Sequence, residues 1–399
     1  MKLFKKILTP ISVAALSLAL ALVGILGIYD CVIPDDISYF EGDSLPVFMH
    51  AQASAIELDG SEGSAEYRLL SLVPIKKVEL TAFKDKKLIP GGMPFGIKFF
   101  TDGLIVTGFC DVEGENGAVN PAREAGLKTN DLITHINGVA ASGTESLSNA
   151  IDSSQGAEIT LTLLRGENIR EMKVTPVKCV TDGKYKTGIL IRDSGAGIGT
   201  VSFIDKESGM FAGLGHGICN SENGALIPML RGAVVDVTIS GIEKGQSGAP
   251  GEIKGFFNQK KLGSLIKNTE CGVFGVFSEV PENPLSNPLP IGLKNDLKEG
   301  EAIIYCTLDD GVMNSYSVLI SDIDTGAEGG KCFTVKVTDP RLIEKTGGIV
   351  QGMSGSPIIQ NGRIVGAVTH VMINDPTRGY GIFIENMLAA SQMPTPRAA

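Results

Sequence analysis

The sequence has little with which to bind nucleic acid or a metal ion. Its net charge is −10 and it carries no basic stripe, which argues against a nucleic-acid binder. Only four histidines occur, and no His-Glu-x-x-His or Cys-x-x-Cys spacing is present, so no motif predicts a metalloenzyme. We therefore expect no metal, no other cofactor and no nucleic-acid partner.

Tryptophan is absent and aromatic residues make up only 6% of the chain, whereas glycine occurs 50 times. This composition suits short strands and tight turns more than helical bundles. The seven cysteines are scattered and odd in number, unlike the dense framework of a small disulfide-bonded domain. We interpret most of them as small buried hydrophobic residues, and a pair of Cys219 with His216 stays open. The length of 399 residues allows two or three domains.

Residues 1–29 have the pattern of a membrane signal anchor that forms a transmembrane helix. Lysines at the start precede an uncharged apolar run from Ile7 to Tyr29, and roughly 20 apolar residues cross a bilayer as a helix. Basic residues before the run and acidic residues after it direct the rest of the chain outward. A cleaved signal peptide is the alternative. Both interpretations place the functional part outside the cytoplasm.

Residues 30–87 are interpreted as a spacer with short strands. Acidic residues, glycine, serine and alanine are mixed up to about residue 65 with no sustained period. Apolar residues after Tyr67 predict one or two strands, interrupted at Pro74 because proline cannot donate a backbone hydrogen bond.

Residues 88–178 contain an order of elements with a specific signature. A glycine-rich turn at 91–96 leads into a strand, a second strand follows at 104–109, and the segment 121–138 reads PAREAGLKTNDLITHING. An amphipathic helix at 146–153 and an alternating strand at 157–165 come next. This block resembles a bacterial PDZ domain, which has an α+β fold.

The PDZ resemblance implies that Phe95, Gly96 and Ile97 form a peptide-binding, carboxylate-accepting loop. Backbone N–H groups of that loop would bind the carboxylate at the end of a partner chain, while the peptide adds as a strand. A PDZ fold that serves only as a rigid spacer is the alternative interpretation.

From residue 183 to about 390 the pattern changes to short strands separated by turns. Such strands are expected at 199–203, 233–239, 272–277 and 332–337, among others. Regular short strands with glycine turns predict an all-β sandwich or barrel, and this length suffices for two small barrels packed together. The chain as a whole is therefore predicted to be mainly β.

The segment from Gly347 to Ile359 has the pattern of a loop that presents a nucleophile. Ser354 is flanked by Met353 and Gly355, and a β-branched run follows Pro357. Glycines at 352 and 355 permit a tight turn, which would bring the N–H groups of Gly352 and Ser354 together as an oxyanion hole. The alternative is a glycine-rich turn with a solvated serine.

A serine nucleophile needs a base, and that base needs an orienting partner. His216 is the best candidate for the base, since glycines on both sides let it point into a cleft and it precedes the serine. His370, 16 residues after Ser354, is the rival. We expect activity to fall as the pH drops through roughly 6–7 if a histidine is the base.

Asp339 is the candidate for the orienting acid, because it follows a strand and Pro340 fixes the chain beyond it. Its rivals are Asp236, Asp309 and Asp310. The order His216, Asp339, Ser354 is that of the chymotrypsin class. A second motif, Gly-Gln-Ser-Gly-Ala-Pro at 245–250, makes Ser247 an alternative nucleophile, but a polar segment follows it where a buried strand would begin.

The whole chain up to about residue 390 resembles the stage IV sporulation protein B peptidase family. The resemblance is carried by TGGIVQGMSGSPIIQNGRIVGAVTHVMIND at 346–375, by RDSGAGIGT at 192–200, by GLGH at 213–216 and by DPRL at 339–342. It implies a chymotrypsin-like double β-barrel serine endopeptidase at 183–390, with His216, Asp339 and Ser354 as catalytic residues. Thr369 is a further hydroxyl that could support the site.

The resemblance also implies a biological setting. Members are exported from the forespore into the space between the two membranes around it, where they cleave themselves and a membrane-bound regulator of mother-cell sigma-factor processing. The expected partners are protein substrates, including the chain itself, a membrane-bound signalling complex, and peptide chain ends bound by the PDZ domain. The alternative is a non-catalytic exported PDZ scaffold with a degenerate protease domain.

Overall fold

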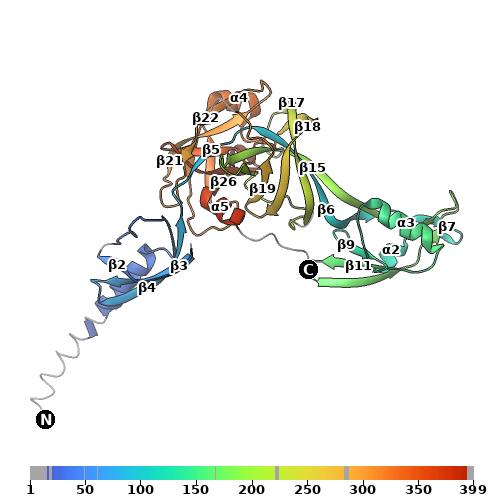
Figure 1. The fold of residues 1–399 in the computed structure, drawn as a ribbon, viewed down its shortest axis with the longest axis horizontal. Coiled ribbons are helices and arrows are strands. Elements are labelled where there is room, and N and C mark those ends of the chain that lie inside the picture. The colour runs from blue at the N-terminus through green and yellow to red at the C-terminus, as the bar shows by residue number, and fades with distance from the viewer. Residues whose placement is uncertain are drawn as a thin grey trace, which may run out of the picture. The chain divides into compact units, whose positions relative to one another are not determined.

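The computed structural model describes residues 16–17, 20–48, 50–60, 62–166, 168–220, 224–282 and 287–392. The chain divides into two units. The first comprises Met1–Lys86 with Leu293–Asp296, and the second comprises Lys87–Gly292 with Leu297–Ala399. Both are drawn in Figure 1, and each is described separately below.

The predicted anchor is described only in part. Residues 1–15, 18 and 19 lie outside the described residues, and residues 20–32 are helical. Within the part of the chain that the structure describes, no helix is both long and apolar enough to cross a membrane. The membrane anchor at 1–29 stays a prediction.

Residues 36–83 fold into a small sheet with a core of its own, so the short strands expected within 30–87 are present. Its strands are β1 (Asp36–Phe40), β2 (Ala51–Asp59), β3 (Glu62–Leu69) and β4 (Val73–Phe83), in the order β1-β4-β3-β2. Tyr67, Val78 and Leu80 are at most 1% exposed and form its core. The sequence did not predict β2 and β3, because small and polar residues alternate in them. Few large apolar side chains mark the buried face of these strands.

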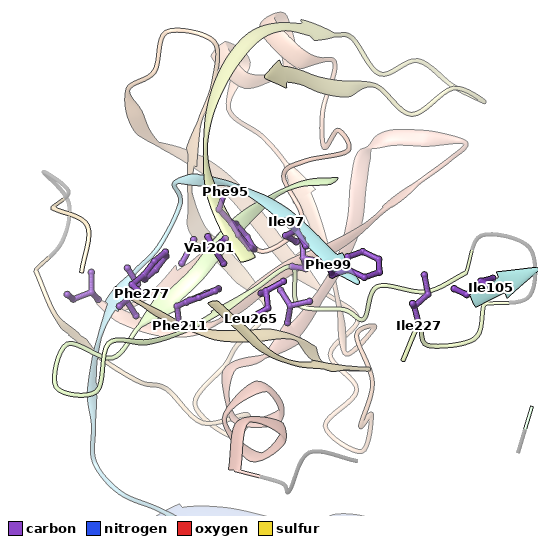
Figure 2. Packing of buried hydrophobic residues seen from close by; sticks show 14 of the residues in the cluster. Phe95, Ile97, Phe99, Ile105, Val201, Phe211, Ile227, Leu265 and Phe277 are labelled. Atoms are coloured by element: carbon purple, nitrogen blue, oxygen red, sulfur yellow. The ribbon is translucent and has the colours of Figure 1, made fainter. Parts of the chain in front are cut away.

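The second unit contains two barrels, and the first begins with β5 (Lys87–Pro90). Its ring is formed by six strands paired in the order β6-β17-β18-β19-β16-β15, and β15 pairs back to β6. These strands are β6 (Pro94–Phe109), β15 (Ile189–Ile204), β16 (Met210–Gly213), β17 (Met229–Glu243), β18 (Glu252–Thr269) and β19 (Gly272–Phe277). Figure 2 shows Phe95, Val201, Phe211 and Phe277 packed together in its interior. Among them, Phe211 and Phe277 stack at 4.4 Å between ring centroids.

The second barrel is closed and runs β21-β22-β23-β26-β25-β24. Its strands are β21 (Gly300–Thr307), β22 (Met313–Ser321), β23 (Phe333–Val337), β24 (Pro357–Gln360), β25 (Arg363–Met372) and β26 (Asp375–Phe383). The helix α4 (Pro340–Thr346) lies between β23 and β24, α5 (Ile384–Gln392) follows β26, and the short β20 (Leu289–Pro290) pairs with β5. These two barrels confirm the prediction of a mainly β, chymotrypsin-like peptidase fold.

A PDZ module is inserted into the first barrel between two of its neighbouring strands. β6 and β15 both continue out of the barrel, so that Ile105 and Arg192 still pair with each other inside the module (Figure 1). Between them lie β7 (Val112–Gly114), β8 (Gly117–Val119), α2 (Pro121–Glu124), β9 (Leu132–Ile136), β10 (Val139–Ala140), α3 (Thr144–Ser154), β11 (Ile159–Arg165), β12 (Asn168–Val174), β13 (Val177–Lys178) and β14 (Tyr185–Lys186). Leu104, Ile133 and Leu161 are fully buried in the core of the module.

The assignment of Phe95, Gly96 and Ile97 to a carboxylate-binding loop was wrong. These residues lie in β6 in the middle of the first barrel, where Gly96 pairs with Ile198 on one side and Val235 on the other. Phe95 is 0% exposed, and Figure 2 shows it in the barrel core with Ile97. A Cβ atom on Gly96 would lie 2.6 Å from Val235, so glycine is required by packing rather than by a ligand.

The boundaries 88–178 predicted for the PDZ domain therefore include barrel strands at one end and omit a module strand at the other. A glycine-rich turn followed by a strand is compatible with the PDZ module and with the first barrel alike. The pattern therefore does not show which sheet the strand joins.

Candidate active site

Ser354 lies in the loop between α4 and β24, where the glycines at 347, 348, 352 and 355 all have positive φ values. Gly347 ends α4 with a φ of 77°, and Gly352 and Gly355 have φ values of 98° and 99°. A Cβ atom on Gly355 would lie 1.9 Å from the carbonyl oxygen of Thr200. Only glycine combines these positive φ values with such a close approach, which explains the glycine spacing around the serine.

The two N–H groups predicted to form the oxyanion hole have no acceptor within the described residues. The carbonyl of Gln351 accepts from Ile253 N at 2.8 Å, and the carbonyl of Met353 accepts from Ser356 N at 2.9 Å. Because C=O and N–H point in opposite directions across a planar peptide unit, these bonds fix the directions of Gly352 N–H and Ser354 N–H. Gly352 and Ser354 both line one cleft. Their role as oxyanion donors stays a prediction.

His216 follows β16 through a tight turn, in which Leu214 and Gly215 have φ values of 67° and 69°. Its Nδ1 lies 2.9 Å from the carbonyl oxygen of Gly217. A carbonyl only accepts, so Nδ1 carries the proton and Nε2 keeps a lone pair, as a general base requires. Burial lowers the pKa of His216 below its usual value, and the bond to Gly217 opposes that shift.

His216 and Ser354 line the same cleft, which has a volume of about 330 Å³. The cleft is lined by β6, β15, the segment after β16 and the loop before β24. Its walls are apolar side chains: Ile97, Phe99, Ile198, Leu214 and Ile218. Folding therefore brings the predicted base and nucleophile to one site. The apolar walls were missed from the sequence, although the alternation of Phe95, Ile97 and Phe99 was a signal for them.

The Ser354 hydroxyl does not bond to His216 in this structure. It donates to the carbonyl oxygen of Thr369 at 2.6 Å. The hydroxyl proton of Ser354 therefore points at a backbone carbonyl, and the hydroxyl must turn away from that carbonyl before a base could take the proton.

His370 packs against the proposed base. The two imidazole centroids lie 4.6 Å apart with an interplanar angle of 33°. Burial, and then the nearby His216 and Lys331, lower the pKa of His370 to about 4. Its Nδ1 is buried without a hydrogen-bond partner. His370, the rival candidate, is therefore a neutral neighbour of His216 at ordinary pH.

Asp339 does not contact His216, so its assignment as the orienting acid has no support in the geometry. Its carboxylate accepts from Arg341 N at 2.9 Å and from the Arg341 guanidinium at 2.7 Å, and from Ser317 N at 3.3 Å. The bond to Arg341, opposed by burial, lowers the pKa of Asp339 to about 2. Asp339 is instead the N-cap of α4. Aspartate is favoured at that position because its side chain accepts a hydrogen bond from a free N–H group of the first helical turn.

The other residues weighed from the sequence have identifiable partners elsewhere. Asp236 accepts from Asn258 at 2.7 Å, and Asp309 forms an ion pair with Lys345. Asp310 lies 3.8 Å from Lys345 as well.

Ser247 is exposed and donates to the carbonyl of Asn374 at 2.9 Å. The Thr369 hydroxyl donates to the carbonyls of Gly330 and Tyr380, not to Ser354. Cys219 lines the cleft, and burial raises the pKa of its thiol. Across the described residues, no group of three His, Cys, Asp or Glu side chains could hold a metal ion.

Comparison with known families gives two matches. The family described as SpoIVB peptidase S55 matches residues 183–388, and the PDZ domain family matches residues 120–165. No curated protein matches the chain.

Several solved structures resemble parts of this chain, with low sequence identity and low TM-scores. The PDZ domain of an SdrC-like protein from Listeria monocytogenes is 23% identical, with 23% of this chain and 87% of that chain covered and a TM-score of 0.19. The Rv3671c protease from M. tuberculosis in its active form is 12% identical, with coverages of 51% and 77% and a TM-score of 0.31. Deg5 is 17% identical, with coverages of 48% and 80% and a TM-score of 0.29.

Proposed function

This chain belongs to the SpoIVB peptidase S55 family and is a serine peptidase, and we propose that it is an endopeptidase with Ser354 as nucleophile and His216 as general base. The observation that carries the proposal is the common cleft, which Ser354, His216 and the N–H-bearing Gly352 all line. Residues that share a cleft in this way could supply the nucleophile, the base and the oxyanion donors that acyl transfer requires, and this supports the proposal.

In the proposed reaction, Ser354 Oγ turns from the Thr369 carbonyl toward His216 Nε2 and attacks a peptide carbonyl carbon. Nε2 takes the hydroxyl proton as the C–O bond forms, and the N–H groups of Gly352 and Ser354 stabilise the oxyanion. His216 then gives that proton to the leaving amine as the C–N bond breaks. Water, deprotonated by the same Nε2, next attacks the ester on Ser354, and the returned proton restores the serine hydroxyl as the acid product leaves. The carbonyl of Gly217, rather than a carboxylate, holds the imidazole tautomer.

The test of this function is Ser354→Ala in the full chain. We expect turnover of a protein substrate to fall by up to about 10⁶-fold, and labelling by a fluorophosphonate probe to disappear. Ser247→Ala is the matched control, because the same motif surrounds an exposed serine outside the cleft. Undiminished cleavage by Ser354→Ala would place the nucleophile elsewhere.

We propose further that this peptidase acts in sporulation signalling, supported by the family's description and by the resemblance of motifs along the chain. It would be exported from the forespore through residues 1–29, would cleave itself and a membrane-bound regulator, and would so activate mother-cell sigma-factor processing. The PDZ module would bind peptide chain ends. Intact-mass analysis of the protein recovered from sporulating cells tests the self-cleavage step, since an unchanged full-length mass excludes it.

A non-catalytic scaffold is the second candidate, and two observations favour it. The Ser354 hydroxyl bonds to Thr369 rather than to a base, and Asp339 bonds to Arg341 rather than to His216. A fluorophosphonate probe separates the two functions, because a scaffold would give no labelling at any pH or in the presence of any protein substrate.

A further inference from the structure

Thr200 lies on β15 at the point where this strand passes the loop that carries Ser354. Its neighbour Val201 bonds toward the start of β6, because Val201 N donates to the Met93 carbonyl at 3.0 Å. Backbone groups alternate in direction along a strand, so the N–H and C=O groups of Thr200 point the other way. They therefore face segments outside the pair that β15 forms with β6.

On that side, Thr200 holds the nucleophile loop with two hydrogen bonds. Its hydroxyl donates to the Gly352 carbonyl at 2.7 Å, and its N–H donates to the Ser354 carbonyl at 3.0 Å. Thr200 itself is only 2% exposed, whereas its bond to Gly352 is partly buried. The hydroxyl is thus fixed in the first barrel and reaches out to the loop.

The two bonds flank the peptide unit that carries one of the proposed oxyanion donors. The Gly352 carbonyl belongs to the unit that ends at Met353 N, and the Ser354 carbonyl belongs to the unit that ends at Gly355 N. Between them lies the unit formed by the Met353 carbonyl and the Ser354 N–H. A peptide unit is planar and turns as a whole, so holding both neighbouring units restricts the direction of the Ser354 N–H.

Thr200 also contacts the segment that leads to the proposed base. Its carbonyl accepts from Leu214 N at 3.2 Å, two residues before His216. Leu214 has a φ of 67°, a conformation that is unfavourable for a residue with a side chain and that persists only with support from its surroundings. A single residue of the first barrel therefore bonds to both segments that supply the candidate site.

We infer that Thr200 is a positioning residue, whose hydroxyl holds the nucleophile loop in the conformation that aims the Ser354 N–H at the oxyanion. Gly352 has a φ of 98° and no side chain, so little besides hydrogen bonding opposes rotation of the peptide unit that follows it. Thr200 acts through this loop and not on the substrate. The inference rests on the proposed function, in which Ser354 is the nucleophile.

Loss of the hydroxyl should act on the transition state more than on substrate binding. In Thr200→Val a methyl group takes the place of the hydroxyl and covers the Gly352 carbonyl without donating to it, which is unfavourable for a polar group. Because that carbonyl is only partly buried, its peptide unit can regain a partner by turning toward water. A turned unit misdirects the neighbouring Ser354 N–H, whose contribution is made chiefly in the transition state.

The test compares Thr200→Val, which keeps the branched shape, with Thr200→Ser, which keeps the donor. With an internally quenched peptide that the wild type cleaves, Thr200→Val should lower kcat by about ten- to hundredfold at nearly constant KM. A peptide boronate imitates the tetrahedral intermediate, so its inhibition constant should rise by the same factor. Thr200→Ser should restore both values to within about threefold of wild type, because serine retains the hydroxyl donor.

Ser202→Ala is the matched control. Ser202 also lies on β15, is 1% exposed, and its hydroxyl has no hydrogen-bond partner among the described residues. Removal of that hydroxyl breaks no bond, so it should leave kcat within about twofold of wild type. Circular dichroism checks the folding of every variant. Should Thr200→Val fail to fold, Thr200→Ala replaces it and should show the same loss of kcat.

Fluorophosphonate labelling of the wild type and of Ser354→Ala comes first, because it separates two kinds of failure. A wild type that does not label would overturn the proposed function, and this inference with it. With a wild type that labels at Ser354, the inference alone is overturned by equal losses in Thr200→Val and Thr200→Ser, by a change confined to KM, or by an equal loss in Ser202→Ala.

Discussion

The imidazole of His216 lies in surroundings that favour its neutral form. Burial lowers its pKa, and the neighbouring His370, with a pKa of about 4, stays uncharged until strongly acidic pH. A general base works only when deprotonated, so a lowered pKa extends activity toward acid rather than restricting it.

We therefore predict that the acid limb of the kcat/KM profile has its midpoint below pH 6.5, the ordinary pKa of a histidine, whereas the sequence alone indicated a range of roughly 6–7. The measurement is initial rate against pH with a fluorogenic peptide, with circular dichroism at each pH as the control for unfolding. A midpoint at or above pH 6.5 would contradict the burial argument.

Asp339 offers a second test at the scale of one side chain. As the N-cap of α4, it should tolerate asparagine, which also caps helices, while alanine should destabilise the protein by about 1–2 kcal/mol. We predict that Asp339→Asn keeps kcat within about fivefold of wild type.

Measurement of kcat and of the melting temperature for both variants decides the role of Asp339. An orienting acid in a triad loses about 10⁴-fold in kcat on substitution by asparagine. A loss of that size at an unchanged melting temperature would show that Asp339 is the orienting acid of a catalytic triad.

Among the secondary-structure elements, β15 contacts two parts of the candidate site. Its residues Ala196 to Ile198 line the cleft, and Thr200 bonds to the loop that carries Ser354. Over this span β15 pairs with β6 alone, since its pairing with β16 begins at Val201.

The sequence predicted individual motifs and strands better than it predicted which other parts of the chain they contact. The nucleophile loop and its glycines, the histidine between glycines, and the PDZ signature at 121–138 could be recognised locally, because each depends on spacing along the chain. The sheet that Phe95–Ile97 joins, the strand that completes the module, and the partner of Asp339 depend on contacts across many residues. No local pattern distinguishes a capping aspartate from a catalytic one.

At the scale of the whole molecule, the insertion of the module between β6 and β15 defines where it can be removed. Phe100 and Ser194 pair directly across the two strands, so a two-residue Asn-Gly turn can join them as a hairpin. We predict that replacing residues 101–193 by Asn-Gly leaves a folded barrel pair that still labels with fluorophosphonate at Ser354.

Deletion of residues 88–178, the boundaries expected from sequence, is the matched control. It removes the barrel part of β6, including Phe95, and should give insoluble or unfolded protein. Circular dichroism, gel filtration and probe labelling distinguish the two variants. Loss of folding in the 101–193 replacement would show that the module is an integral part of the barrel.

The bond from the Ser354 hydroxyl to the Thr369 carbonyl also bears on how such an enzyme is inhibited. Covalent drugs for hydrolases are usually selected by how fast they react with a serine that is already activated. Here the hydroxyl must first leave the Thr369 carbonyl, so the rate at which a warhead reacts would also report how readily that bond opens. A screen should therefore reward occupancy of the apolar cleft as well as reactivity, because a ligand held there can block the site without forming any covalent bond.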